Sequence, residues 1–285
     1  MSSAPRALLL GHPVAHSASP RIMSALAKAS GRSLDYSILD VLPENLAPTL
    51  EQICADPRVI GLNFTLPHKI EAARISEERA KNIPIIGSAN MWARSEQGFC
   101  AYNTDGPGFI NALKHKGISL MNRDVITLGA GGAARGVSYA CLMAGAKHVF
   151  VWNRSNAKAK SLSEMIPGKI SALDDLAKLP ESFELPPLII NATSLGLKAS
   201  DQGILDKIIM PFEGLLPNAI ATDLVYSTSK ERTPFLRIAE QHGFRVVESA
   251  LAMLALQAVE AFNLWLGQSF SPEEALKVLL PILED

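Results

Sequence analysis

Cysteine is scarce in this sequence and forms no pattern typical of a cross-linked or metal-binding protein. The 285 residues include three cysteines, Cys54, Cys100 and Cys141, which lie far apart and form no CxxC pair. An odd number of scattered cysteines argues against a disulfide scaffold and favours a reduced, cytoplasmic protein. No HExxH motif or Cys/His spacing typical of a zinc site is present, so we expect no metal.

The sequence also lacks a surplus of one charge and a long uninterrupted apolar run. It has 27 Lys and Arg against 28 Asp and Glu, so no overall field would attract nucleic acid or an anionic membrane. The most apolar stretch, residues 250–267, is interrupted by Gln257, Glu260 and Asn263 at steps of three. That spacing indicates an amphipathic helix and not a membrane span. We therefore expect a small-molecule substrate, no nucleic-acid or membrane partner, and no indication of oligomeric state.

Short apolar runs alternate with helical patterns along the chain, and this alternation predicts an α/β fold with mostly parallel sheets. The strand-like runs are residues 6–10, 35–41, 58–65, 124–128, 148–152, 187–191, 219–225 and 244–247.

The segment 124–134, DVITLGAGGAA, has the features of a dinucleotide-binding turn. A strand precedes the glycines, a helical pattern follows them, and the spacing is G-x-G-x-x-A. Gly129 permits the tight turn, Gly131 lets the backbone approach a pyrophosphate, and Ala134 allows close packing of helix on strand. The helix N-terminus adds free N–H groups for phosphate oxygens. The candidate cofactor residues here are Gly129, Ala130, Gly131, Gly132 and Ala133.

The end of the next strand favours NADP over NAD. An NAD site usually has an acidic residue about 20 residues past the glycines, to bond the ribose 2′-hydroxyl. This chain instead has basic and polar groups suited to a 2′-phosphate, Asn153, Arg154, Ser155 and Lys158. A solvated basic turn is the alternative interpretation. Further on, Thr193 and Ser194 follow another strand, where ligands of open α/β sheets bind.

Four polar clusters elsewhere are candidates for a substrate site. Ser17 and Ser19 precede Pro20, where Ser19 could simply act as a helix N-cap or both hydroxyls could hold a carboxylate. Lys69 follows the predicted strand 58–65, although a lone lysine is more often a surface residue. Asn90 belongs to IIGSANMW, which we interpret as another strand end, and Asp105 could merely cap the helix that follows it.

These segments together resemble the shikimate dehydrogenase family. In chain order from residue 11 to residue 258 they are GHPVAHSASP, GLNFTLPHK, GSANM, NTDGPG, GAGGA, NRS, NATSLG and MLALQA. The resemblance implies reversible reduction of 3-dehydroshikimate to shikimate with NADPH, by a catalytic pair of Lys69 and Asp105. It implies that the substrate carboxylate is held by Ser17, Ser19 and Tyr226. It implies that the ring hydroxyls are bonded by Thr65, Asn90 and Gln257, and that Met253 flanks the nicotinamide.

The resemblance also implies two domains. We expect a discontinuous α/β substrate-binding catalytic domain of residues 1–106 and 245–285, an inserted Rossmann-type NADP-binding domain of residues 107–244, and a cleft between them. The chain departs from the family pattern at Met23-Ser24, Phe64, Met91, Ala252 and the lengthened segment 226–234. We expect these changes to flank the pockets, so two alternatives stay open: a quinate or related cyclitol-acid dehydrogenase, and a catalytically idle ligand-binding relative.

Overall fold

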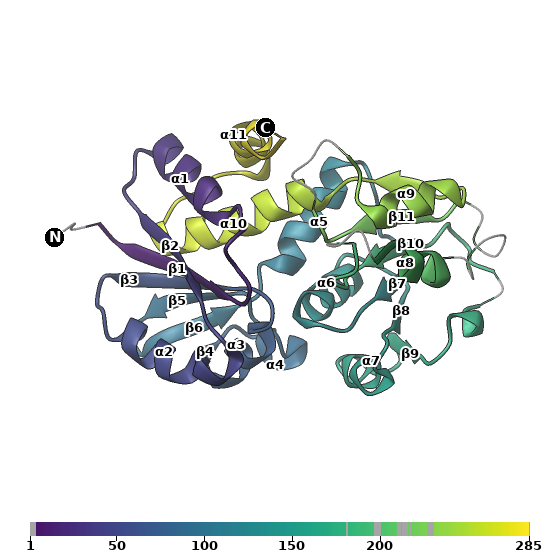
Figure 1. Ribbon diagram of the computed structural model, residues 1–285, viewed down its shortest axis with the longest axis horizontal. Coiled ribbons are helices and arrows are strands. Elements are labelled where there is room, and N and C mark those ends of the chain that lie inside the picture. The colour runs from purple at the N-terminus through teal and green to yellow at the C-terminus, as the bar shows by residue number, and fades with distance from the viewer. Residues whose placement is uncertain are drawn as a thin grey trace. The chain divides into compact units, whose positions relative to one another are not determined.

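A computed structural model describes residues 4–180, 182–196, 201–209, 212, 216, 218–226 and 231–284. The chain divides into two compact units (Figure 1). Unit 1 comprises Met1–Gly108 and Leu254–Leu283, and unit 2 comprises Phe109–Met253. Both division points fall inside helices, α5 (Asp105–His115) and α10 (Ala250–Leu266). Within the described part of the chain, no helix has the length and apolar character needed to cross a membrane.

Unit 1 contains a six-stranded mixed sheet in the order β2-β1-β3-β5-β6-β4. Its strands are β1 (Arg6–Gly11), β2 (Asp35–Asp40), β3 (Val59–Phe64), β4 (Glu78–Arg79), β5 (Met91–Ser95) and β6 (Gly98–Tyr102). β1 pairs in parallel with β2 and β3, whereas β5 is antiparallel to β3 and β6. The helices are α1 (Ser19–Ser30), α2 (Leu46–Cys54), α3 (Lys69–Ile75), α4 (Ile83–Ile86) and α11 (Pro272–Glu284), with a 3₁₀ turn, η1 (Pro43–Asn45).

The two faces of this sheet are covered by different helices because side chains alternate along each strand. Leu62 and Phe64 of β3 belong to a core shared with α2, α3 and α4. Gly61 points to the other face, where a Cβ would lie 2.0 Å from the Trp265 indole nitrogen of α10. Glycine is therefore required at this position for α10 to pack directly on the sheet.

One predicted strand end is wrong. The segment IIGSANMW does not begin with a strand, because residues 83–86 form the short helix α4. Pro84 lies in its first turn, where proline needs no amide hydrogen, and Gly87 ends it in the left-handed conformation with a φ of 63°. Asn90 lies just before β5 and not after a strand.

Unit 2 contains a fully parallel six-stranded sheet in the order β12-β11-β10-β7-β8-β9. Its strands are β7 (Asp124–Leu128), β8 (His148–Trp152), β9 (Ile170–Leu173), β10 (Leu188–Asn191), β11 (Ile220–Asp223) and β12 (Arg245–Val247). Read from β9, this is the 3-2-1-4-5-6 order of the Rossmann fold, whose ligands bind where the strand order reverses. That point lies between β7 and β10.

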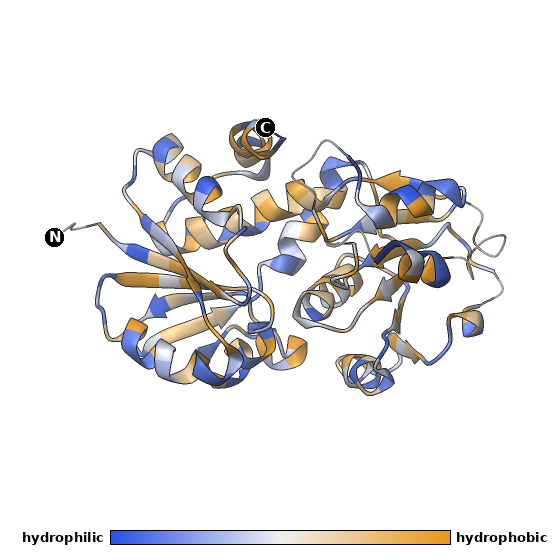
Figure 2. Cartoon of the chain, viewed as in Figure 1, coloured by the Kyte–Doolittle hydropathy of each residue, from blue (hydrophilic) through white to orange (hydrophobic). Residues whose placement is uncertain are grey.

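The helices of unit 2 cover both faces of its sheet. They are α6 (Gly132–Met143), α7 (Asn156–Ser163), α8 (Gln202–Ile209) and α9 (Pro234–Gln241), with a 3₁₀ turn, η2 (Leu176–Lys178). Ile126 and Leu128 of β7 belong to the core formed with α8 and α9. Thr127 between them points the other way and bonds Ser138 of α6. Every residue of β7 is buried, as expected for a parallel strand covered by helices on both faces. Figure 2 shows hydrophobic residues along the strands of this sheet.

Candidate active site

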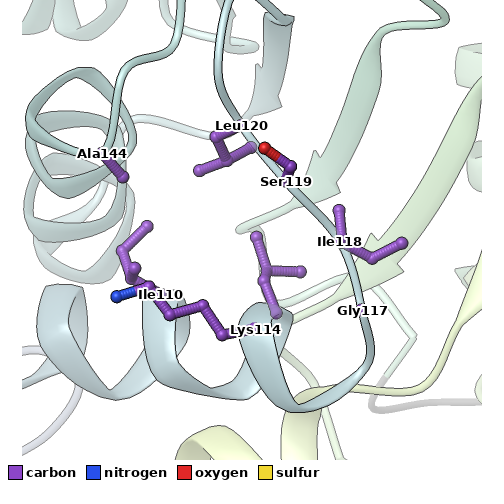
Figure 3. A pocket seen from close by; sticks show the side chains of 8 residues that line it. Ile110, Lys114, Gly117, Ile118, Ser119, Leu120 and Ala144 are labelled. Carbon is purple, nitrogen blue, oxygen red and sulfur yellow. The ribbon is translucent and has the colours of Figure 1, made fainter.

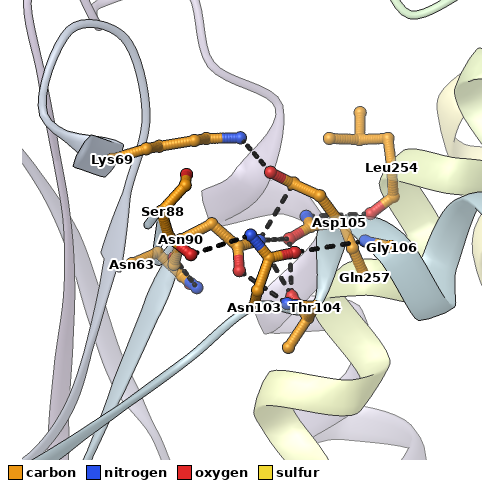
Figure 4. A network of polar contacts seen from close by, with 10 residues as sticks. All are labelled: Asn63, Lys69, Ser88, Asn90, Asn103, Thr104, Asp105, Gly106, Leu254 and Gln257. Carbon is orange, nitrogen blue, oxygen red and sulfur yellow. Dashed lines mark hydrogen bonds and ion pairs between the residues drawn. The ribbon is translucent and has the colours of Figure 1, made fainter. Parts of the chain in front are cut away.

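Lys69 and Asp105 meet in unit 1 at the ends of two strands. Lys69 begins α3 soon after β3, and Asp105 begins α5 soon after β6. Nζ of Lys69 lies 2.6 Å from Oδ2 of Asp105, and the two side chains are 17% and 5% exposed (Figure 4). The amide of Gly106 donates to Oδ1 of Asn103 at 3.2 Å, so Asn103 supports the start of α5 and the Asp105 carboxylate is left to face Lys69.

Asn90 is the centre of the polar network around this pair. Its side chain is buried, and Nδ2 shares its two hydrogens among Asp105 Oδ1 at 3.0 Å, Thr104 Oγ1 at 2.9 Å and Gln257 Oε1 at 3.2 Å. Oδ1 of Asn90 accepts from the Thr104 amide at 2.7 Å. These contacts fix the orientation of the Asn90 amide. They also bring α10, through Gln257, to the catalytic pair.

Ser17 and Ser19 form a second polar group in unit 1. The Ser17 hydroxyl donates to Ser19 Oγ at 3.1 Å, and the Ser19 amide donates to Ser17 Oγ at 3.2 Å. The N-cap interpretation of Ser19 is wrong, because the N-cap residue of α1 is Ala18 and it makes no side-chain cap bond. The Ser19 hydroxyl does not cap the helix and forms a hydrogen bond with Tyr36.

Tyr36 and Asn63 link the serines to Asn90. The Tyr36 hydroxyl donates to Asn63 Oδ1 at 2.9 Å, and Asn63 Nδ2 donates to the Asn90 carbonyl at 3.3 Å. Burial raises the pKa of Tyr36, against the opposing effect of the Ser19 bond, so Tyr36 stays a neutral donor. Asn63 can be found from the sequence, because it is a polar residue near the end of an otherwise apolar strand. No local signal identifies Tyr36.

The expectation that Phe64 flanks a ligand pocket is wrong. Phe64 is buried in the core of unit 1, where its ring packs edge-on against Trp92 at a centroid distance of 5.1 Å. Asn63, its neighbour, points to the opposite face of the strand, toward the polar network. Thr65 follows β3, and its amide donates to the Leu10 carbonyl at 2.9 Å.

In unit 2 the glycine turn has the geometry that a dinucleotide requires. Gly129 has a φ of 110°, and a Cβ there would lie 2.7 Å from the Ala192 carbonyl oxygen. Gly131 is the N-cap of α6, and a Cβ on it would meet nothing within 4 Å. The first glycine is therefore needed for packing, whereas the second borders open space at a helix N-terminus. This arrangement fits a pyrophosphate.

The turn after β8 presents the groups predicted for a 2′-phosphate. Arg154, Ser155 and Lys158 are exposed, and Nδ2 of Asn153 donates to the Ser155 carbonyl at 2.9 Å. Ser155 is the N-cap of α7, and its side chain makes no cap bond. The segment from residue 152 to residue 160 contains no carboxylate. These residues fit a phosphate dianion.

The loop after β10 lies beside the glycine turn. The Thr193 hydroxyl donates to Asn191 Oδ1 at 2.6 Å, and the Ala192 amide donates to the Leu128 carbonyl at 2.8 Å. Ser194 is exposed, Tyr226 is half-buried, and Met253 is buried in α10. The part of the lengthened segment from residue 227 to residue 230 lies outside the described residues.

A pocket of about 280 Å³ in unit 2 is a separate feature (Figure 3). It lies between the second half of α5, the chain leading to β7 and the end of α6. Its lining residues are Ile110, Leu113, Lys114, Gly117, Ile118, Ser119, Leu120 and Ala144. None of these is a predicted site residue.

A cation held by a carboxylate among hydroxyls and amides can stabilise negative charge on an oxygen and deliver a proton to it. The same chain has, in unit 2, a sheet of 3-2-1-4-5-6 order with a glycine turn where the order reverses. Together these features define the class of the protein, an α/β oxidoreductase with a Rossmann-type nucleotide-binding unit.

Comparisons with known proteins identify the family. The model described as "Shikimate dehydrogenase substrate binding domain" matches residues 9–91, and that described as "Shikimate / quinate 5-dehydrogenase" matches residues 111–205. The shikimate dehydrogenase (NADP(+)) of Xanthomonas campestris pv. campestris (strain B100) is 37% identical over 267 residues, which cover 92% of this chain and 90% of that protein. The chain belongs to the shikimate dehydrogenase family.

Solved structures agree with this membership over nearly the whole chain. Shikimate dehydrogenase from Aquifex aeolicus has a TM-score of 0.82 and 29% identity, covering 98% of both chains. Shikimate 5-dehydrogenase from Thermus thermophilus, in complex with NADP(H) and shikimate, has a TM-score of 0.79 and 34% identity, covering 97% of this chain and 99% of that one.

Proposed function

We propose that the protein is an NADP-dependent shikimate dehydrogenase, which reversibly reduces the ring ketone of 3-dehydroshikimate to shikimate. The observation that carries this proposal is the ion pair of Lys69 and Asp105, bonded to the network of Asn90 and Gln257. These are the side chains that the family resemblance assigns to the reacting oxygen and the ring hydroxyls.

NADPH, when bound, supplies the hydride. As the carbonyl oxygen becomes negative, the Lys69 ammonium stabilises the charge and donates the proton that forms the hydroxyl. Asp105 takes one of the three ammonium hydrogens and orients the others toward the oxygen. In the reverse direction Lys69 receives the proton. Asp105 is itself held by Asn90, so the pair is preorganised before substrate arrives.

The remaining polar groups of unit 1 set the substrate. We assign the substrate carboxylate to Ser17, Ser19 and Tyr226, and the ring hydroxyls to Thr65, Asn90 and Gln257. A site built of hydroxyls and amides rejects an analogue that leaves them unpaired, which supports a polyhydroxylated acid as substrate.

In unit 2 we assign the pyrophosphate to the glycine turn, residues 129–133, and the 2′-phosphate to residues 153–155 and Lys158. We assign Thr193 and Ser194 to the lining of the cofactor groove, and Met253 to the nicotinamide. The free thiols of Cys54, Cys100 and Cys141 support a cytoplasmic location.

Steady-state kinetics with shikimate and with quinate, each paired with NADP⁺ and with NAD⁺, test the proposal. We expect the highest kcat/KM for shikimate with NADP⁺. A higher value for quinate would contradict the substrate assignment, a higher value with NAD⁺ would contradict the cofactor assignment, and no turnover of any pair would contradict the enzyme.

A further inference from the structure

Asp223 is a buried carboxylate at the carboxyl end of β11 in unit 2, and it has no part in the mechanism above. Its side chain is 1% exposed. Oδ1 accepts from Asn191 Nδ2 at 2.8 Å and from the Val225 amide at 2.9 Å, and Oδ2 accepts from the Thr233 hydroxyl at 2.6 Å. A carboxyl group buried away from water is tolerated only when it is hydrogen-bonded in this way.

Asp223 fixes the orientation of the Asn191 amide. Because Oδ1 of Asp223 also receives the Val225 N–H, this oxygen is an acceptor whether or not the carboxyl carries a proton on Oδ2. The NH₂ group of Asn191 must therefore face Asp223, and its oxygen must face the other way. There Oδ1 of Asn191 accepts from the amide of Thr193 at 3.2 Å and from its hydroxyl at 2.6 Å.

The order imposed on Asn191 extends through the loop that follows β10. The second hydrogen of Asn191 Nδ2 is donated to the Leu195 carbonyl at 3.0 Å, and the Leu195 amide donates to Thr193 Oγ1 at 3.0 Å. The side-chain amide of Asn191 thus uses both of its hydrogens and its oxygen within residues 191–195 and on Asp223.

The loop of residues 191–196 lies beside the point between β7 and β10 where the strand order reverses. The Ala192 carbonyl lies so close to Gly129 that a Cβ there would be 2.7 Å away, and the Ala192 amide bonds the carbonyl of Leu128. A displacement of the loop would therefore change the spacing between the two backbone segments that border the cofactor position.

We propose that Asp223 is a positioning residue that holds segment 191–196 against the glycine turn and thereby sets the affinity for NADPH. It acts through Asn191 and touches no part of the cofactor. The identity of the cofactor rests on the proposed function.

The test compares three variants with the wild type. Asp223→Ala removes the anchor. Asp223→Asn keeps an acceptor oxygen for Asn191 and Val225, so it should rescue binding. The matched control is Asp124→Ala, which removes a carboxylate that is 7% exposed at the amino end of β7, the end opposite to the glycine turn.

NADPH binding is measured by fluorescence titration, and kcat and KM are measured with shikimate and NADP⁺. Without the anchor, segment 191–196 is no longer held against the glycine turn, so Asp223→Ala should raise the Kd of NADPH by about 10-fold. Its kcat at saturating NADP⁺ should stay within about 3-fold of wild type, because the catalytic pair is untouched. Asp223→Asn and Asp124→Ala should bind NADPH within about 3-fold of wild type.

Binding by Asp223→Ala within about 2-fold of wild type would overturn the proposal, as would an equal loss in Asp124→Ala. If Asp223→Ala does not fold, Asn191→Ala breaks the same link and should raise the Kd of NADPH by about 10-fold, and unchanged binding there would overturn it too. A wild-type protein that binds NADPH but does not turn over shikimate would contradict the proposed function and leave this inference standing.

Discussion

Lys69 and Asp105 form a 2.6 Å ion pair although 36 residues separate them in the chain. The second oxygen of Asp105 is bonded to Asn90, so the carboxylate is held from both sides. An ammonium has three hydrogens, and Asp105 takes one of them. The pair therefore places an ammonium group beside the polar network, with two N–H hydrogens that are not bonded to Asp105.

Replacing Lys69 with Met tests its role as the proton donor. The variant keeps the length of the side chain and loses the charge, so kcat should fall by about 10²–10⁴, as for a lost acid–base group. The Kd of NADPH should change little, because Lys69 belongs to unit 1 and the cofactor residues to unit 2. Stopped-flow or steady-state absorbance at the NADPH band measures turnover.

The control for this prediction is Lys81→Met, which alters an exposed lysine of the same unit. It should leave kcat unchanged. Turnover of Lys69→Met at the level of this control would show that residue 69 is not the proton donor.

Asn90 should matter to both stability and substrate binding. Asn90→Ala leaves the buried Thr104 amide without its acceptor and removes a donor to Asp105. An unsatisfied buried group costs about 1–3 kcal/mol, so urea denaturation should show a loss of unfolding free energy in that range. The KM for shikimate should rise as well. Unchanged stability and KM together would mean that Asn90 is not the centre of the network.

The sequence predicted the parallel framework and the glycine turn because both depend on local pattern: apolar runs of strand length, and glycines between strand and helix. Each of the eight strand-like runs coincides with a strand of the structure to within a residue or two at its ends. Four strands, β4, β5, β6 and β9, were not predicted, since they are short or mix polar and apolar side chains and their pairing depends on the sheet register.

The contacts of the site depend on tertiary structure and could not be predicted from local pattern. Asn90 and Gln257 are 167 residues apart, and only the packing of α10 brings them together. Phe64 and Asn63 are neighbours in sequence, yet the alternation of the strand directs one to the core and the other to the network. Proximity of Phe64 to site residues along the chain therefore does not place it at the pocket, because the strand face decides its direction.

Arg154→Ala should discriminate between the two nicotinamide cofactors. A charge-assisted bond to the 2′-phosphate is worth about 1.5–3 kcal/mol, so NADP⁺ should lose about that much binding free energy and its Kd should rise accordingly. NAD⁺ lacks the phosphate, and its Kd should change little. Lys169→Ala, which alters another exposed cation of unit 2, serves as the control and should affect neither cofactor. An equal loss for NADP⁺ and NAD⁺ in Arg154→Ala would refute the 2′-phosphate assignment.

Asp223 should make the stability of the protein depend on pH. Burial raises the pKa of Asp223 from 3.8 to about 7, although bonds from Thr233, Val225 and Asn191 oppose the shift. Between these two pH values the folded state keeps a proton that the unfolded chain has released. Because the folded state binds more protons there, the free energy of unfolding falls as the pH rises from about 4 to about 7.

Asp223→Asn cannot titrate in this range, so the difference between the two proteins isolates the effect of Asp223. Relative to this variant, the wild type should lose on the order of 3 kcal/mol of unfolding free energy between about pH 5 and about pH 8. Urea denaturation of both proteins at steps across that range measures the difference, and a shared dependence on other groups cancels. Parallel pH profiles for the two proteins would mean that the Asp223 carboxyl is ionised throughout, with its pKa held low by its hydrogen bonds in spite of burial.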